Sequence, residues 1–172
     1  MPATATDFDR AAEEALAQGL SDENTLKLAS ALAHSFAVRA DEVGILRVNG
    51  ARLEFVYPLK LRNLATIPLN ASGSVAAQTV NAAKPQIINN FSQVRHTTLF
   101  EAVNLREESS GNRQTQVIQK LMSVPIPGGK TPLGVIQVSR KGASPAQAGM
   151  DFNFSDLQKL MSKAAVFTKL LK

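Results

Sequence analysis

The first 36 residues repeat apolar positions with the period of an α-helix, in two pieces separated near Gly19. Residues 7–18 carry a modest apolar stripe, and a second amphipathic run begins after Ser21 or Asp22, either of which can cap a helix. The pattern predicts two consecutive helices. We expect His34, which has apolar neighbours in the second run, to pack between helices.

The period then changes to two, as in β-strands. Residues 42–48 and 51–57 flank Asn49-Gly50, a strong signal for a hairpin with a two-residue loop. The tight register around that loop places Arg47 opposite Arg52. Since like charges at this position repel, we expect water to screen them and interpret Arg47 as a solvated hairpin residue.

The remainder of the chain contains shorter elements and one long irregular segment, residues 90–116. Loops of that length are usually functional or mobile. The last helix, capped by Ser155 with Gln158 as a capping box, has an apolar surface too wide for one contact. The other predicted elements are an extended piece at 65–70, a helix at 73–83, and strands at 86–89, 118–126 and 133–141. This order indicates an α+β fold with an antiparallel sheet.

Composition then excludes several classes of protein. A chain of 172 residues that is 44% hydrophobic fits one domain with its own core. It contains no Cys, which removes thiolate nucleophiles, Cys-ligated metals and disulfides. The chain lacks the uninterrupted apolar run of about 18 residues that a spanning helix needs, and its start has early acids. We therefore expect a cytoplasmic protein with no membrane partner.

The net charge of +5 raises the question of nucleic acid. Residues 1–26 hold six Asp or Glu and one Arg, a net −5, so the remaining residues carry +10. That excess is spread out, with no run of four basic residues, no Trp and a single Tyr for stacking. The sequence therefore predicts no nucleic-acid partner.

Several strings, in order and spacing, resemble the GAF domain family over residues 25–170. They are Gly73–Val80 followed by Lys84–Ile88, the strand pair Ser123–Ile126 and Gly134–Val138, and the helix entry Phe154–Leu157. The resemblance implies a six-stranded antiparallel sheet, with N- and C-terminal helices on one face. It also implies a small-molecule pocket on the other face, roofed by the irregular segment. Residues 25–172 would form this domain, and residues 1–24 a helical extension.

Members of that family that attach bilins or reduce free methionine sulfoxide use Cys, which this chain lacks. Nor does the sequence show a nucleophile and base, or paired carboxylates, at a telling spacing. The two His are far apart and have no metal-ligand spacing. We therefore expect no enzyme, no metal and no cofactor other than an unidentified small-molecule ligand.

Amides, a guanidinium and aromatic rings occur close together where the resemblance places the pocket roof, a set that suits a planar or anionic ligand. The same residues could equally form a loop held by Asn hydrogen bonds and anchored by Phe. Polar residues of the central strands share one parity and need partners, which a ligand, water or neighbouring groups could supply. The candidate ligand-binding residues are Asn90, Phe91, Arg95, His96, Phe100, Gln119, Ser123 and Gln137.

Two further motifs are partial. Cyclic-nucleotide members of the family carry N-K and F-x-x-x-D-E, of which this chain keeps Lys141, Phe152 and Asp156. We expect Lys141 and Asp156 to pair and hold the final loop to its helix, a structural role. Residues 128–131, Gly-Gly-Lys-Thr, look like the end of a phosphate-binding loop, but Pro132 follows directly, so we predict a hairpin loop.

The leading hypothesis is a sensory or regulatory domain that binds a small molecule noncovalently. It would signal through the geometry of a homodimer formed by the terminal helices, with its output in a partner protein. The alternative is an interaction or dimerisation scaffold with no ligand, its pocket filled by its own side chains.

Overall fold

The computed structural model describes residues 6–93 and 117–172. The chain begins with two helices, α1 (Asp7–Gln18) and α2 (Asp22–Ser35), broken at Gly19 as predicted. Of the two residues that could cap the second helix, Ser21 does so, because its side chain accepts a hydrogen bond from the backbone N–H of Asn24.

Six strands form one sheet in the order β3-β2-β1-β6-β5-β4, and all neighbouring strands are antiparallel. The strands are β1 (Val43–Asn49), β2 (Arg52–Tyr57), β3 (Thr66–Pro68), β4 (Gln86–Ile88), β5 (Val117–Ile126) and β6 (Gly134–Gly142). The described residues also contain three short 3-10 helices, η1 (Ala40–Glu42), η2 (Leu59–Leu61) and η3 (Phe91–Gln93).

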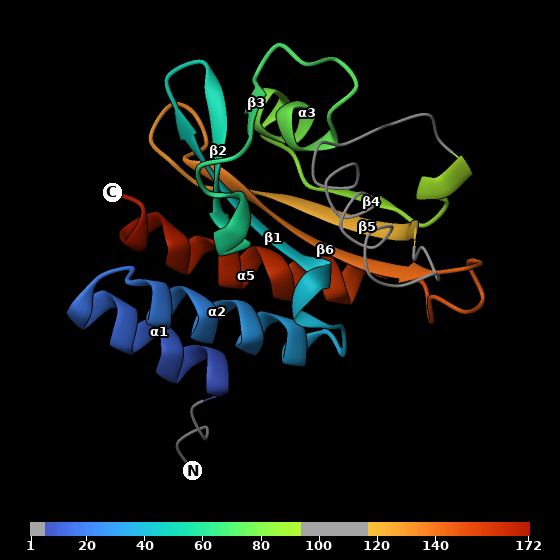
Figure 1. The fold of residues 1–172 in the computed structure, drawn as a ribbon, viewed down its shortest axis with the longest axis horizontal. Coiled ribbons are helices and arrows are strands. Elements are labelled where there is room, and N and C mark those ends of the chain that lie inside the picture. Colours follow the sequence, from blue (N-terminus) through green and yellow to red (C-terminus); the bar gives the residue numbers. More distant parts are fainter. Residues whose placement is uncertain (1–5, 94–116) are drawn as a thin grey trace.

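The sheet separates two hydrophobic clusters. Helices α1, α2 and α5 (Phe154–Leu170) cover one face, here called the helix face, and α3 (Val75–Ala82) packs on the other, here called the α3 face (Figure 1). Met122 and Val124 of β5 belong to the cluster on the helix face, whereas Leu121 belongs to the cluster under α3. This alternation along one strand confirms the predicted α+β fold with a six-stranded antiparallel sheet.

The register of the β1–β2 hairpin differs from the prediction. Asn49 pairs with Arg52, so the two-residue loop is Gly50-Ala51 and not Asn49-Gly50. Gly50 has a φ of +62°, as a loop with Gly in its first position requires. Arg47 therefore faces Glu54, with Nε 3.8 Å from a carboxylate oxygen, and the predicted Arg47–Arg52 contact is wrong.

The cap of α5 also differs. Asn153, not Ser155, is the N-cap, and it exchanges hydrogen bonds of 2.9 Å with Asp156 in a capping box. Both Asn153 and Ser155 are residue types that can cap a helix. A cap at Asn153 has the carboxylate of Asp156 three residues later as its reciprocal partner.

The wide apolar surface of α5 is largely buried within the chain. The ring centroid of Phe167 lies 6.3 Å from that of Phe8 in α1, and both rings are in the cluster on the helix face. Lys163 places its ammonium group 4.6 Å from the centroid of the Phe8 ring. Burial, and then the neighbouring charge of Lys159, lower the pKa of Lys163. The sheet and α1 thus cover two sides of the apolar surface of α5.

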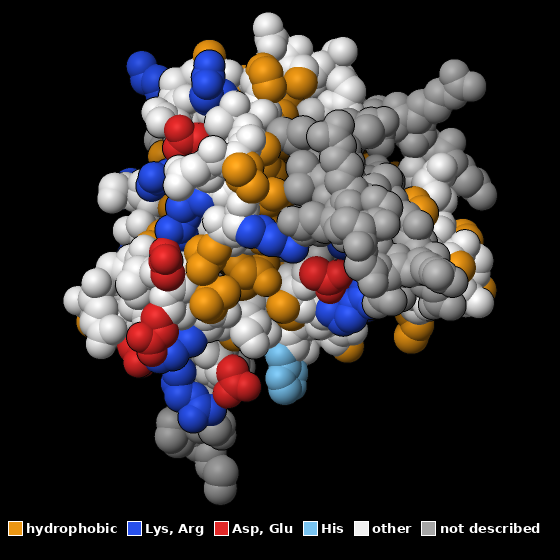
Figure 2. Space-filling view, in the orientation of Figure 1, with side chains coloured by type: hydrophobic (Ala, Val, Ile, Leu, Met, Phe, Trp, Pro, Cys, Tyr) orange, Lys and Arg blue, Asp and Glu red, His pale blue; other side chains and the backbone are white. Residues whose placement is uncertain are grey.

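His34 is exposed, so its predicted packing between helices is wrong. It lines the groove between α1 and α2, and acidic and basic side chains are interleaved over this helical pair (Figure 2). Within residues 6–93 and 117–172, none of the helices has the length and apolar character needed to cross a membrane.

Candidate functional site

A row of buried polar side chains crosses the α3 face. Thr79 of α3 and Ser123 of β5 share a hydrogen bond of 2.8 Å between their hydroxyl oxygens. Gln137 of β6 donates from Nε2 to the Ser123 hydroxyl at 3.2 Å. Thr79 and Ser123 are fully buried and Gln137 is 2% exposed. The structure therefore brings together two of the predicted site residues, Ser123 and Gln137.

Within the described residues, the carboxamide of Gln137 is only half satisfied. Its Nε2 has Ser123 as a partner, but no group in the described part of the chain donates a hydrogen bond to its Oε1. A buried acceptor without a donor costs free energy, so buried polar atoms normally have a partner. Among the described residues, this oxygen is the group of the polar row to which a ligand could add a bond.

Gln119 and Phe91 form a second part of the predicted site. Gln119 Nε2 donates to the carbonyl of Gly142 at 2.9 Å, and its Oε1 accepts from the Ser92 hydroxyl at 2.6 Å. Phe91 is 1% exposed and packs in the cluster under α3, while Asn90 is exposed. Phe91 is thus an anchor in the core, as the loop alternative predicted. Ligand contact by Phe91, Asn90 and Gln119 stays a prediction.

Arg95, His96 and Phe100 lie outside the described residues. Their predicted part in ligand binding therefore stays a prediction.

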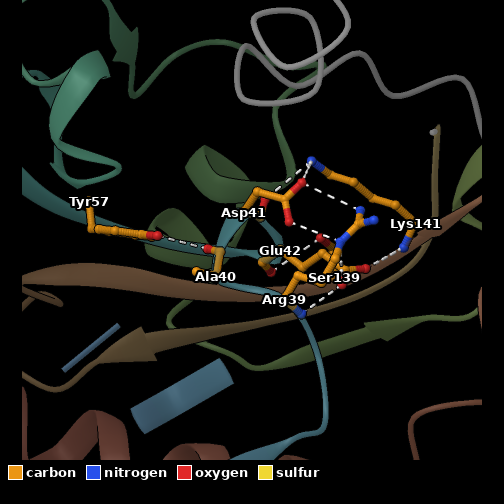
Figure 3. A network of polar contacts seen from close by, with 7 residues as sticks. All are labelled: Arg39, Ala40, Asp41, Glu42, Tyr57, Ser139 and Lys141. Atoms are coloured by element: carbon orange, nitrogen blue, oxygen red, sulfur yellow. Dashed lines mark hydrogen bonds and ion pairs between the residues drawn. The ribbon is translucent and has the colours of Figure 1, made fainter. Parts of the chain in front are cut away.

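A charged network holds the start of β1 against the end of β6 (Figure 3). The buried carboxylate of Glu42 accepts from the backbone N–H of Arg39 at 2.8 Å and from that of Lys141 at 2.6 Å. Asp41 accepts from Arg39 at 3.1 Å through its carboxylate, and its carbonyl accepts from Lys141 Nζ at 3.1 Å. These bonds fix the geometry at this end of the sheet, because each carboxylate oxygen of Glu42 has its own donor.

Tyr57 joins the edge of this network, donating its hydroxyl to the carbonyl of Ala40 at 2.9 Å (Figure 3). Burial, and then the negative charge of Asp41, raise the pKa of Tyr57 above its ordinary value near 10.0. The phenol therefore remains a hydrogen-bond donor at neutral pH.

The predicted pair of Lys141 and Asp156 is wrong. Lys141 reaches Asp41, with Nζ 3.6 Å from a carboxylate oxygen, and Asp156 binds the backbone of Asn153 at the start of α5. Phe152 is 3% exposed and packs in the cluster on the helix face. Lys141, Phe152 and Asp156 thus have structural contacts, but in separate places.

Three residues hold the loop before α5, and sequence reasoning missed the contacts of two of them, Lys120 and Arg140. Lys120 is 5% exposed and binds the carbonyl of Gly149 and the carboxylate of Asp151. Arg140 donates to the carbonyl of Met150, and its guanidinium lies 4.5 Å from the centroid of the Phe152 ring. The third residue, Asn89, binds the backbone of Phe152. A buried Lys in a strand is the signal that could have indicated such a contact.

The loop at residues 128–131 connects β5 to β6 and leads into a strand. The predicted hairpin loop is confirmed, and the resemblance to a phosphate-binding loop is limited to four letters. In the described residues, no three His, Cys, Asp or Glu side chains gather where they could hold a metal ion.

Comparison of the sequence finds no matching protein family and no matching curated protein. The structure, in contrast, resembles many solved structures. The GAF domain from an Acinetobacter phosphoenolpyruvate-protein phosphotransferase aligns with a TM-score of 0.66 at 13% identity, covering 96% of this chain and 90% of that chain. Residues 122 to 287 of a methyl-accepting chemotaxis protein align with a TM-score of 0.66 at 16% identity, covering 94% of each chain.

An enzyme is also among the similar structures. The free methionine-R-sulfoxide reductase from Neisseria meningitidis, solved with its substrate, aligns with a TM-score of 0.64 at 16% identity, covering 96% of this chain and 86% of that chain. Reductases from Staphylococcus aureus and Thermoplasma acidophilum are similar too. The expectation that this chain is no enzyme is therefore wrong, because several of the structures that share its fold are enzymes. What the similar structures share is the fold itself, and the chain has a GAF-like fold.

Proposed function

We propose that this chain is a sensory or regulatory GAF-like domain that binds a small molecule noncovalently on the α3 face. The observation that carries the proposal is the buried Oε1 of Gln137, to which no described residue donates. A ligand with an N–H or O–H group would supply the missing donor. GAF domains of a two-component sensor histidine kinase and of a phosphotransferase are among the similar structures, which supports a regulatory role.

The second part of the proposal is a homodimer through the terminal helices. Between α1 and α2 runs a groove of about 520 Å³ that contains Leu26, which is 48% exposed. Asp7 and Glu14 line it together with Arg10 and Lys27. A second copy related by a two-fold axis would present the same mixture of charges, so acids and bases of the two copies could alternate while Leu26 is covered. A ligand that favours one arrangement of the helices would shift its population.

Native mass spectrometry of the gently purified, intact chain tests both parts, with the denatured sample as reference. We expect a dimer that carries a reproducible extra mass, and we expect that mass to be lost on denaturation. The mass would also identify the ligand. We also propose that the domain regulates a partner protein and that both are in the cytoplasm.

A substitution at Gln137 tests the carrying observation. Gln137→Met keeps the length of the side chain and removes the acceptor, so the dimer should persist and the fraction carrying the extra mass should fall about tenfold. Gln78→Met makes the same chemical change on α3, where the side chain bonds to the carbonyl of Ser72, and should leave that fraction unchanged. Equal ligand content in the two variants would show that Gln137 does not bind the ligand.

The alternative, a scaffold that binds no ligand, is favoured by Gln119, whose carboxamide nitrogen and oxygen each bond to a group within the chain. A dimer without extra mass, together with no mass gained from a metabolite extract, would support the scaffold. A bare monomer at tens of micromolar would contradict the dimer mechanism itself.

A further inference from the structure

A groove outside the polar row opens beside the β5–β6 loop. It has a volume of about 310 Å³ and lies between the loop, the connection from α3 to β4 and the middle of α5. Its lining residues are Ala83, Pro85, Pro125, Pro127, Gly128, Gly129, Lys130, Thr131, Pro132 and Met161. We call it the proline groove, because four of the eight prolines of the chain line it.

The walls of the proline groove are fixed before any partner binds. Each proline has a restricted φ and no backbone N–H. The Thr168 hydroxyl donates to the carbonyl of Pro127 at 2.7 Å, which ties the loop to α5. A Cβ at Gly128 would lie 2.1 Å from the carbonyl oxygen of Thr131, so the loop closes tightly upon itself. A partner entering such a preformed groove pays little for ordering it.

The surface of the groove is apolar but has a cationic rim. Met161 is 42% exposed and offers a flexible apolar contact. Lys130 lines the groove, Lys84 stands between the lining residues Ala83 and Pro85, and both lysines are exposed. No carboxylate lines the groove, and within the described part of the chain neither lysine forms an ion pair.

The charges of α5 also favour a negatively charged occupant. Its sole acid, Asp156, lies at the N-terminal end and is engaged in the helix cap. Lys169 directly follows Thr168, the residue that contacts the loop. Positive charge next to the groove is therefore not neutralised along the helix, and complementarity requires a negatively charged occupant.

We propose that the proline groove docks an extended acidic peptide segment of a partner protein, with one apolar side chain of the peptide against Met161 and its carboxylates beside Lys84 and Lys130. A peptide suits this site better than a nucleic acid because no aromatic ring lines it for base stacking. The single tyrosine of the chain, Tyr57, is buried and bonded to Ala40. This interaction would be distinct from ligand binding on the α3 face.

Two peptide pools of about nine residues test the proposal on the full chain. One pool alternates Asp or Glu with randomised apolar residues, and the other replaces every acid by Ser, Asn or Gln. We expect the immobilised protein to retain the acidic pool about tenfold better than the neutral pool. In the labelled protein, amide resonances of residues 128–131 should shift on addition of the retained peptides.

Substitutions in the proline groove test whether the acidic peptides bind there. The double substitution Lys84→Glu with Lys130→Glu should lower retention of the acidic pool about tenfold, and Met161→Ser about fivefold. Lys60→Glu reverses the charge of an exposed lysine on η2, away from the groove, and should leave retention unchanged. All four lysine and methionine positions are exposed, so the variants should fold, which circular dichroism would check.

Three outcomes would overturn the proposal. The first is equal retention of the acidic and neutral pools. The second is an equal effect of the groove variants and Lys60→Glu. The third is a single-stranded oligothymidine that binds more tightly than the acidic pool and displaces it, which would make the groove a nucleic-acid site.

Discussion

Asn89 and Phe152 bind each other through two hydrogen bonds that join β4 to the start of α5. Asn89 Nδ2 donates to the carbonyl of Phe152 at 3.0 Å, and the backbone N–H of Phe152 donates to Asn89 Oδ1 at 2.9 Å. The two residues are 63 positions apart in the chain. The Asn89 side chain thus bonds to the backbone of Phe152 as a neighbouring strand would. It fixes the position at which the loop before α5 ends.

Asn89→Ala should lower the free energy of unfolding by about 2 kcal/mol, because it leaves a partly buried backbone donor and acceptor without partners. Urea denaturation followed by circular dichroism measures this change. Asn70→Ala, at an exposed position, is the matched control and should stay within about 0.5 kcal/mol of the parent. Similar losses for both variants would mean that the Asn89 bonds contribute nothing specific.

Gly134 marks a close approach of two strands. A Cβ there would lie 2.1 Å from the carbonyl oxygen of Leu46, whereas a Cβ at Gly129 would meet nothing within 4 Å. Gly134→Ala should therefore force β1 and β6 apart and cost about 3 kcal/mol of stability. Gly129→Ala should be nearly neutral in the same thermal or urea unfolding experiment. If Gly134→Ala is as stable as Gly129→Ala, the backbones of β1 and β6 do not approach closely at Gly134.

Tyr57 gives a pH test, because it is the single tyrosine and its ionisation can be followed alone. Its folded pKa is raised by burial and by Asp41, so the folded chain binds more protons than the unfolded chain above pH 10.0. Stability linked to this group is therefore constant below that pH and falls as pH rises above it. Tyrosinate absorbance should titrate at higher pH in the native chain than in urea.

Tyr57→Phe is the control for that titration. It removes the ionisable hydroxyl together with its bond to Ala40, so it should lower stability by about 1 kcal/mol near neutral pH. The difference between parent and variant should then shrink as pH rises above 10.0. A difference that stays constant with pH would contradict the raised pKa.

Most elements of the fold could be predicted because their signals are local. Gly19 ends one helix with a φ of +89°, and Ser21 caps the next, so both boundaries follow from single residue types. The hairpin register could not be read from its turn, because Gly50 can occupy either position of a two-residue loop. The cross-strand charges held the deciding signal, since one register opposes Arg47 to Arg52 and the other opposes it to Glu54.

The candidate site was predicted only in part, because hydrogen bonds between distant strands leave little trace in the sequence. The parity of Ser123 and Gln137 indicated a shared face, and they lie in contact. Their third partner, Thr79, gave no signal, since a Thr in a helix is usually a neutral choice. The predicted pairing of Lys141 was wrong for a similar reason. Its partner Asp41 is 100 positions away, and Asp156 is engaged in the N-cap of α5.

The last prediction concerns the groove between α1 and α2. Leu26→Glu replaces an exposed Leu by a carboxylate in the groove that Glu14 also lines. A second copy that covers the groove would have to bury this carboxylate. The dimer should therefore weaken at least about tenfold while the monomer keeps its fold, as measured by sedimentation and circular dichroism. Leu64→Glu, at a 77% exposed Leu after η2, is the control and should not change association. Unchanged association of Leu26→Glu would exclude the α1–α2 groove as the dimer contact and direct the search to another face of the helical layer.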